Sequence, residues 1–131
     1  MPQIVRWYLR TALIMFVLAL VAGVLQALGT PGLTLVYFHL LMVGWVTQFI
    51  MGVALWMLPK YTQAQPRGYD RLSWVGYGLL NAGLLLRAAA EPASALAPGG
   101  AWGWALVLSA LLQWLAGALF VFNAWRRVKE K

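Results

Sequence analysis

Residues 33–61 read LTLVYFHLLMVGWVTQFIMGVALWMLPKY, and residues 33–57 within this stretch contain no Asp, Glu, Lys or Arg. An α-helix rises about 1.5 Å per residue, and roughly 20 apolar residues span the hydrocarbon core of a bilayer. The stretch exceeds this minimum, so it predicts a tilted transmembrane helix. It also holds His39, the one histidine of the chain. A histidine at membrane depth is costly and usually has a partner, which makes His39 the first candidate functional residue.

The composition of the whole chain is typical of a membrane protein. Its 131 residues are 63% hydrophobic and have a mean hydropathy of +0.74, which is too apolar for a soluble domain. We therefore expect a single transmembrane domain over residues 1–131 and no separate soluble domain. The chain contains no cysteine, which excludes disulfides, thiolate metal sites, iron–sulfur clusters and covalently attached c-type haem.

Four apolar stretches predict four membrane spans. They cover approximately residues 8–28, 33–58, 72–90 and 101–125. A glycine- and proline-containing turn at residues 29–32 separates the first two, Pro59 ends the second, and Glu91 with Pro92 is expected to stop the third. The predicted fold is an all-α integral membrane protein with four transmembrane helices in an up-down bundle.

The basic residues predict the orientation of this bundle. Of the ten Lys and Arg, two lie at the start of the first span, three between the second and third spans, and four after the fourth. The other two loops have none, so the positive-inside rule places both termini in the cytoplasm. The net charge of +7 is thereby explained by membrane orientation, and we expect no nucleic acid partner. The expected location is the inner (cytoplasmic) membrane, with membrane lipids as partners.

The tenth basic residue, Arg87, lies inside the third span, about one turn before its outer end. His39 lies about a turn and a half from the same end of the second span, so the two residues are expected at similar depth. One interpretation is that Arg87 pairs with Glu91 at i,i+4 or extends to the outer surface. The other is that Arg87 meets acidic groups of a ligand near the outer face, such as haem propionates.

A helical rotation of about 100° per residue places an apolar wall beside His39. The residues that share its face are Met42, Val43, Val46, Ile50, Val53 and Met57. The opposite face holds Leu41, Gly44, Gln48, Gly52 and Leu55. Glycines on that face suit packing against neighbouring helices. An imidazole above an aliphatic wall suits a flat apolar cofactor such as haem better than a hard cation; the alternative is a hydrogen bond from His39 to a serine or backbone carbonyl on another helix.

The other intramembrane polar residues predict helix packing. On the fourth span, Ala105, Ser109, Gln113 and Gly117 recur at four-residue spacing, which indicates interhelical hydrogen bonds. All three acidic residues lie at or beyond predicted interfaces, which disfavours a pump built on intramembrane carboxylates. No P-loop, catalytic triad or zinc-type histidine spacing is present, so we do not expect the chain to be an enzyme by itself.

The second span resembles a histidine-bearing helix of the haem–copper oxidase catalytic subunit. The pattern consists of Phe38-His39, Gly44, Gly52 and Leu58-Pro59-Lys60-Tyr61. It is most similar to short four-span relatives of the cbb3-type subunit, whose second helix follows HLHLMLxGFVTMMIxGVAYHxLPRF, against YFHLLMVGWVTQFIMGVALWMLPKY here. Residues 79–87, LLNAGLLLR, also resemble the stretch that follows in those proteins. The resemblance covers approximately residues 33–88.

This resemblance implies that His39 is an axial ligand of a b-type haem near the outer face. It implies that Arg87 lies near the haem propionates, with Met42, Val43 and Val46 lining the cofactor. Two other histidine positions of the family hold Tyr37 and Trp56 here, so we expect no copper and no oxygen reduction.

The number of histidines also bears on assembly. One chain offers one histidine, so bis-histidine ligation of iron requires two copies. The oxidase subunit has an approximately threefold arrangement of four-helix groups, and the resemblance therefore favours a homotrimer, with a homodimer as the simpler alternative. The expected function is electron transfer or sensing of a gas or redox state. The alternative is a haem-free structural or accessory membrane protein that retains the oxidase-like scaffold.

Overall fold

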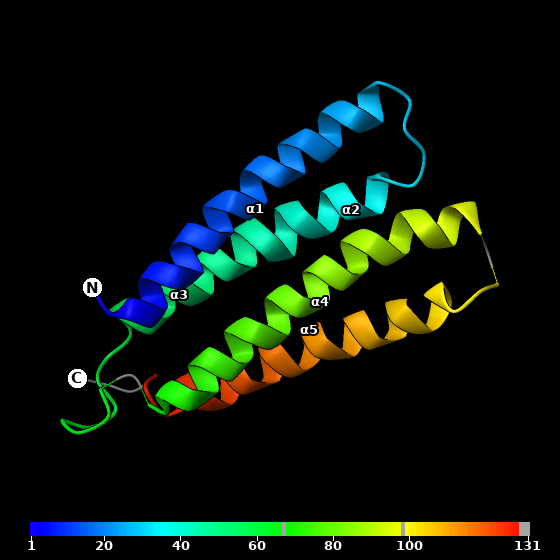
Figure 1. Cartoon of the computed structure of the whole chain (residues 1–131). Helices are drawn as coiled ribbons and strands as arrows, with labels where there is room; N and C mark the ends of the chain where they lie inside the picture. The colour runs from blue at the N-terminus through cyan, green and yellow to red at the C-terminus, as the bar shows by residue number, and fades with distance from the viewer. Residues whose placement is uncertain (67, 98, 129–131) are drawn as a thin grey trace.

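A computed structural model describes residues 1–66, 68–97 and 99–128. All regular structure in these ranges is helical, which confirms the expected all-α class. The elements are α1 (Gln3–Ala27), α2 (Thr34–His39), the π-helical segment η1 (Leu40–Thr47), α3 (Gln48–Met57), α4 (Asp70–Leu96) and α5 (Trp102–Trp125). Helices α2, η1 and α3 continue one another as a single rod (Figure 1). The basic residues Arg67, Lys129 and Lys131 used in the orientation argument lie outside the described residues.

Three helices of the described chain are long and apolar enough to cross a membrane. They are Gln3–Ala27, Thr34–Met57 and Trp102–Trp125, with mean hydropathies of 2.2, 1.8 and 2.1. Helix α4 has 27 residues but is not among the three. Its sequence includes four charged residues: Asp70, Arg71, Arg87 and Glu91. The described chain is thus all-helical and has three helices that can each span a membrane, while the fourth span and the orientation of the termini stay predictions.

The helices pack as two hairpins. Helix α1 lies along α2, η1 and α3, and α4 lies along α5 (Figure 1). The hairpins meet mainly where α4 crosses α2 and η1. The buried core between them includes Tyr8, Met15, Leu55, Leu80 and Leu84. The candidate site lies where the two hairpins meet, at the end of α2.

The face predicted to pack against neighbouring helices is the face that the structure buries. Gly44, Gln48, Gly52 and Leu55 are buried and Leu41 is half-buried. A Cβ atom built on Gly44 would lie 2.9 Å from the Cβ of Met15, and one on Gly52 would lie 2.9 Å from the Cβ of Tyr8. Only glycine permits α1 to approach this closely.

The expectation that Glu91 and Pro92 end the helix of the third span is wrong, because α4 continues to Leu96 with Pro92 inside it. A proline within a helix removes one backbone hydrogen bond and usually bends or ends it. Helical backbone hydrogen bonding resumes after Pro92, since the Ala97 N–H donates to the Ala93 carbonyl at 2.9 Å. Gly32, with a φ of +79°, packs its backbone closely on Pro92. Contact with the loop before α2 therefore covers this turn and supports the continued helix.

Arg127 ties the end of α5 to the end of α3. Its side chain is almost fully buried, with the residue 2% exposed. Nε donates to the Pro59 carbonyl at 2.9 Å, and Nη2 donates to the Leu58 carbonyl at 2.7 Å. The last carbonyls of a helix lack intrahelical partners, so a basic side chain is a natural donor for this region.

Arg127→Leu is expected to lower the free energy of unfolding by about 2 kcal/mol, because hydrogen bonds from charged groups contribute roughly 1.5–3 kcal/mol. Unfolding followed by circular dichroism in a mild detergent measures the change. Arg71→Leu is the matched control, since Arg71 is exposed near the same end of the bundle. Equal losses in the two variants would contradict the role assigned to Arg127.

Candidate functional site

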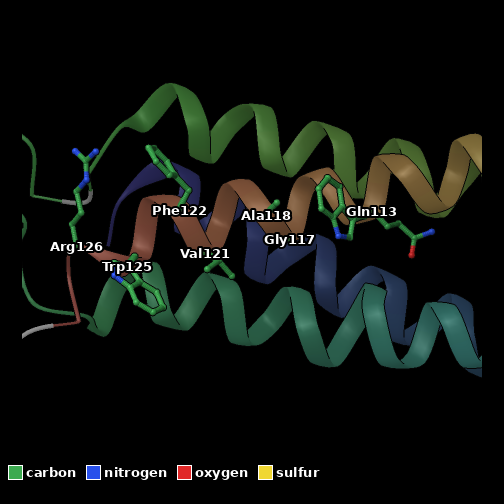
Figure 2. A pocket seen from close by; sticks show the side chains of 8 residues that line it. Gln113, Gly117, Ala118, Val121, Phe122, Trp125 and Arg126 are labelled. Atoms are coloured by element: carbon green, nitrogen blue, oxygen red, sulfur yellow. The ribbon is translucent and has the colours of Figure 1, made fainter.

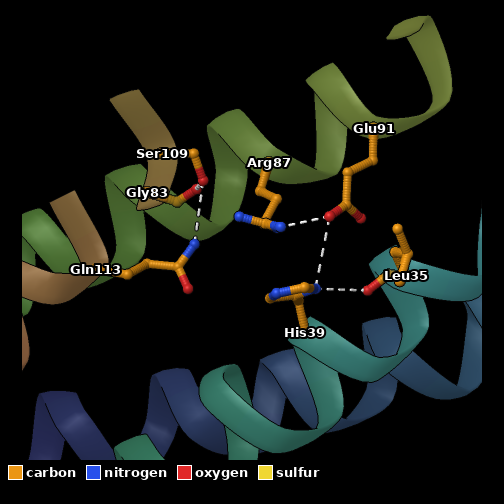
Figure 3. Close-up of polar contacts among 7 residues, drawn as sticks. All are labelled: Leu35, His39, Gly83, Arg87, Glu91, Ser109 and Gln113. Atoms are coloured by element: carbon orange, nitrogen blue, oxygen red, sulfur yellow. Dashed lines mark hydrogen bonds and ion pairs between the residues drawn. The ribbon is translucent and has the colours of Figure 1, made fainter. Parts of the chain in front are cut away.

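His39 is the last residue of α2 and directly precedes η1. Its Nδ1 lies 2.8 Å from the Leu35 carbonyl oxygen and 3.5 Å from Oε1 of Glu91 on α4 (Figure 3). The side chain is 27% exposed. A carbonyl oxygen only accepts hydrogen bonds, so Nδ1 carries the proton in this contact. In the neutral imidazole, the lone pair therefore resides on Nε2.

This arrangement of the ring is suited to ligation of a metal. Metal-binding histidines almost always donate one ring N–H to a carbonyl or carboxylate, which fixes the ring and the tautomer. His39 has both kinds of acceptor beside Nδ1. Nε2 points away from Leu35 and Glu91 (Figure 3), and it makes no hydrogen bond to any residue within the described ranges. The ring thus offers one free nitrogen ligand.

The surface beside the ring is a shallow apolar hollow of about 180 Å³. It is lined by Phe38, His39, Met42 and Val43. Three of the sequence-predicted site residues, His39, Met42 and Val43, thus come together here, while Val46 is half-buried and does not line the hollow. Pockets that enclose cofactor-sized ligands measure roughly 300–1,000 Å³. One chain alone does not enclose a porphyrin at this hollow.

Segment η1 alters the helical phase just after His39. Its eight residues form π-type bonds, which join residues five apart and occur frequently at functional sites. The faces predicted from the sequence assume a uniform rotation of about 100° per residue. The predicted faces nevertheless hold, because Met42 is exposed while Gly44 and Gln48 are buried. No local sequence signal predicts this segment.

Glu91 connects His39 to Arg87. The Arg87 Nε donates to Glu91 Oε1 at 2.5 Å, one turn along α4, which confirms the predicted i,i+4 pairing. The same oxygen lies 3.5 Å from His39 Nδ1. The Glu91 side chain is only 4% exposed and that of Arg87 is 21% exposed. Arg87 and His39 thus both contact Oε1 of Glu91. This agrees with the expectation that the two residues lie at similar depth.

The sequence analysis did not predict that Glu91 contacts His39. The expected position of Glu91 at the membrane interface depends on a helix that ends at Pro92. One feature of the sequence could have predicted this contact: Glu91 lies four residues after Arg87. The two side chains therefore share a helix face if the helix continues through Pro92.

A second cavity adjoins the charged pair. It has a volume of about 410 Å³ and is lined by Arg87 and Glu91 together with Thr34 and Ser94, among others. Glu91 already compensates the charge of Arg87, and its Oε2 is buried without a hydrogen-bond donor among the described residues. Any acidic group of a ligand that approaches Arg87 therefore also meets the negative charge of Glu91. The role of Arg87 toward propionates stays a prediction.

The polar ladder on α5 packs helices together. Ser109 Oγ donates to the Gly83 carbonyl of α4 at 2.8 Å, and Gln113 Nε2 donates to Ser109 Oγ at 3.1 Å (Figure 3). Gly83 permits this approach, since a Cβ there would lie 3.1 Å from the Ser109 carbonyl oxygen. The prediction of interhelical hydrogen bonding on this helix is confirmed for Ser109, while the bond from Gln113 stays within α5.

Comparison with known proteins found no relative of this chain. No protein-family model, no curated protein and no solved structure matches the chain. The relationship to the haem–copper oxidase subunit stays a prediction from the pattern in residues 33–88.

Proposed function

We propose that the chain is a homo-oligomeric membrane protein that binds b-type haem through His39 Nε2, in an apolar slot completed by a second copy. It has four spans with cytoplasmic termini and resides in the inner (cytoplasmic) membrane. The observation that supports this proposal best is the orientation of the imidazole: Nδ1 is bonded to the Leu35 carbonyl, and Nε2 is free. A ring held in this way would be preorganised to bind iron through Nε2.

The donor set fits one side of a haem. His39 supplies the nitrogen, and the exposed Met42 and half-buried Val43 supply apolar contact with the macrocycle. Arg87 is the residue proposed to face the propionates, from the 410 Å³ cavity beside it. The cofactor would supply one-electron transfer or reversible binding of a small gas. Two imidazoles require two copies, and we retain the homotrimer suggested by the resemblance, with the homodimer as the smaller assembly.

His39→Ala is expected to abolish haem binding. Wild-type protein, expressed with ample haem and purified in mild detergent, is expected to show a Soret band that the variant lacks. Trp56→Ala is the control, because Trp56 is an exposed residue of the same rod that does not line the hollow. Free imidazole added to His39→Ala with haem is expected to restore the band, which separates ligand loss from misfolding. A colourless wild type under these conditions contradicts the proposal.

A second candidate function is a haem-free structural or accessory role. It is favoured by the contact of His39 and Arg87 with one carboxylate oxygen of Glu91, which joins α2 to α4 without any cofactor. This candidate predicts no iron in elemental analysis of the wild type. It also predicts that His39→Ala retains the oligomer size of the wild type in light scattering.

A further inference from the structure

The second half of α5 carries a large open groove. The groove has a volume of about 790 Å³, and its lining includes Trp114, Gly117, Val121, Phe122, Trp125 and Arg126 (Figure 2). Helix α5 packs mainly on α4, so much of its surface has no neighbour among the described residues. Trp114 is 68% exposed and Trp125 is 76% exposed. This surface, named the Arg126 groove below, is separate from the site at His39.

The shape of the Arg126 groove suits a hydrocarbon chain. A Cβ built on Gly117 meets no atom within 4 Å, so at this point the groove is open as far as the helix backbone. Among the described residues that line the groove, Gln113 and Arg126 carry the amide and the charged side chain, and they lie near its two ends. The distance between these ends along the helix is about 20 Å, more than half of the roughly 30 Å hydrocarbon core. An acyl chain of one leaflet matches this length and polarity.

The position of the Arg126 guanidinium suits an anion. Its Nη1 donates to the hydroxyls of Tyr61 and Tyr69 at 3.3 Å each. Its Cζ lies 5.6, 5.7 and 5.3 Å from the ring centroids of Tyr61, Tyr69 and Phe122, within the range of cation–π contacts. It forms no ion pair with any carboxylate of the described chain. These hydroxyl and ring contacts hold the guanidinium in place at the end of the groove.

We propose that the Arg126 groove binds one anionic phospholipid, with its phosphate on Arg126 and one acyl chain along Gly117 and Phe122. Basic side chains at the cytoplasmic end of membrane helices attract anionic headgroups. A twofold partner fits this surface poorly, because packing of α5 on α5 would bring the two Arg126 cations close to one another. The proposal does not depend on haem binding.

Competition between two lipids tests the proposal. The purified protein is incubated with equal amounts of phosphatidylglycerol and phosphatidylcholine, and bound lipid is counted by native mass spectrometry. We expect one retained phosphatidylglycerol per chain, favoured about fivefold over phosphatidylcholine, as one basic residue near the surface provides. Arg126→Gln is expected to remove the preference. Gly117→Leu, which fills the groove, is expected to lower retention of both lipids.

Two matched variants serve as controls. Arg71→Gln removes an exposed charge near the same end of the bundle, and Gly78→Leu adds the same side chain at a helical glycine that also has open space around it. Both are expected to retain lipid as the wild type does. The proposal fails if Arg126→Gln keeps the preference or if Gly117→Leu behaves like Gly78→Leu. It also fails if Gly117→Leu reduces the oligomer size, because a second copy then occupies the groove.

Discussion

The double variant Gly44→Val and Gly52→Val is expected to lower the free energy of unfolding by about 4 kcal/mol. Each added Cβ would lie 2.9 Å from a Cβ atom of α1, that of Met15 or Tyr8. These neighbouring atoms are attached directly to the α1 backbone, so a rotamer change does not relieve the contact. Overpacking of this kind costs roughly 1–3 kcal/mol per site. The sites are about 12 Å apart along the rod, so their effects should add.

Thermal or denaturant unfolding in mild detergent, followed by circular dichroism, measures this loss. Gly78→Val is the control for the change in helix propensity, because no atom lies within 4 Å of a Cβ at Gly78. That control is expected to be as stable as the wild type or slightly more stable, since valine favours a helix over glycine. If the double variant matches the control, α1 does not pack on this face.

The same two glycines show what the sequence predicts well. Long apolar runs determine the helices, and the four-residue spacing of Gly44, Gln48 and Gly52 identifies the buried face. The positions where helices change or end are less predictable. Segment η1 has no local signature, and Pro92 lies inside α4 although a proline usually ends a helix. Tertiary contacts determine both features, and such contacts cannot be inferred from a single sequence.

The candidate site was predictable to a similar extent. The expected depth of His39 and Arg87 followed from the span boundaries, and the apolar neighbours followed from helical rotation. The bridging role of Glu91 did not follow, because it depends on the continuation of α4 past Pro92. The Arg126 groove was also beyond the sequence argument. It requires Tyr61 and Tyr69 to fold onto the end of α5, more than fifty residues away along the chain.

Glu91→Gln is expected to lower the free energy of unfolding by about 3 kcal/mol. The carboxylate is 4% exposed and compensates Arg87, and removal of one partner of a buried ion pair costs roughly 3–5 kcal/mol. The lower end applies because Arg87 is 21% exposed and water screens part of its charge. The double variant Arg87→Gln with Glu91→Gln should recover part of the loss, since no uncompensated charge remains. Unfolding of the two single variants and the double variant gives the coupling energy.

Comparison of Glu91→Gln with His39→Ala separates the two proposed functions. If His39 ligates iron, Glu91 is a positioning residue, and Glu91→Gln should weaken haem affinity by less than the roughly 10- to 100-fold that loss of a bonded partner causes, because the Leu35 carbonyl still accepts from Nδ1. His39→Ala should then remove the haem while costing little stability in its absence, because Arg87 still neutralises Glu91. If His39 instead holds α2 to α4, His39→Ala should destabilise the protein measurably relative to the wild type, with no Soret band in any variant. Haem titration and unfolding of the wild type, His39→Ala and Glu91→Gln therefore show whether the His39 imidazole binds iron or serves helix packing.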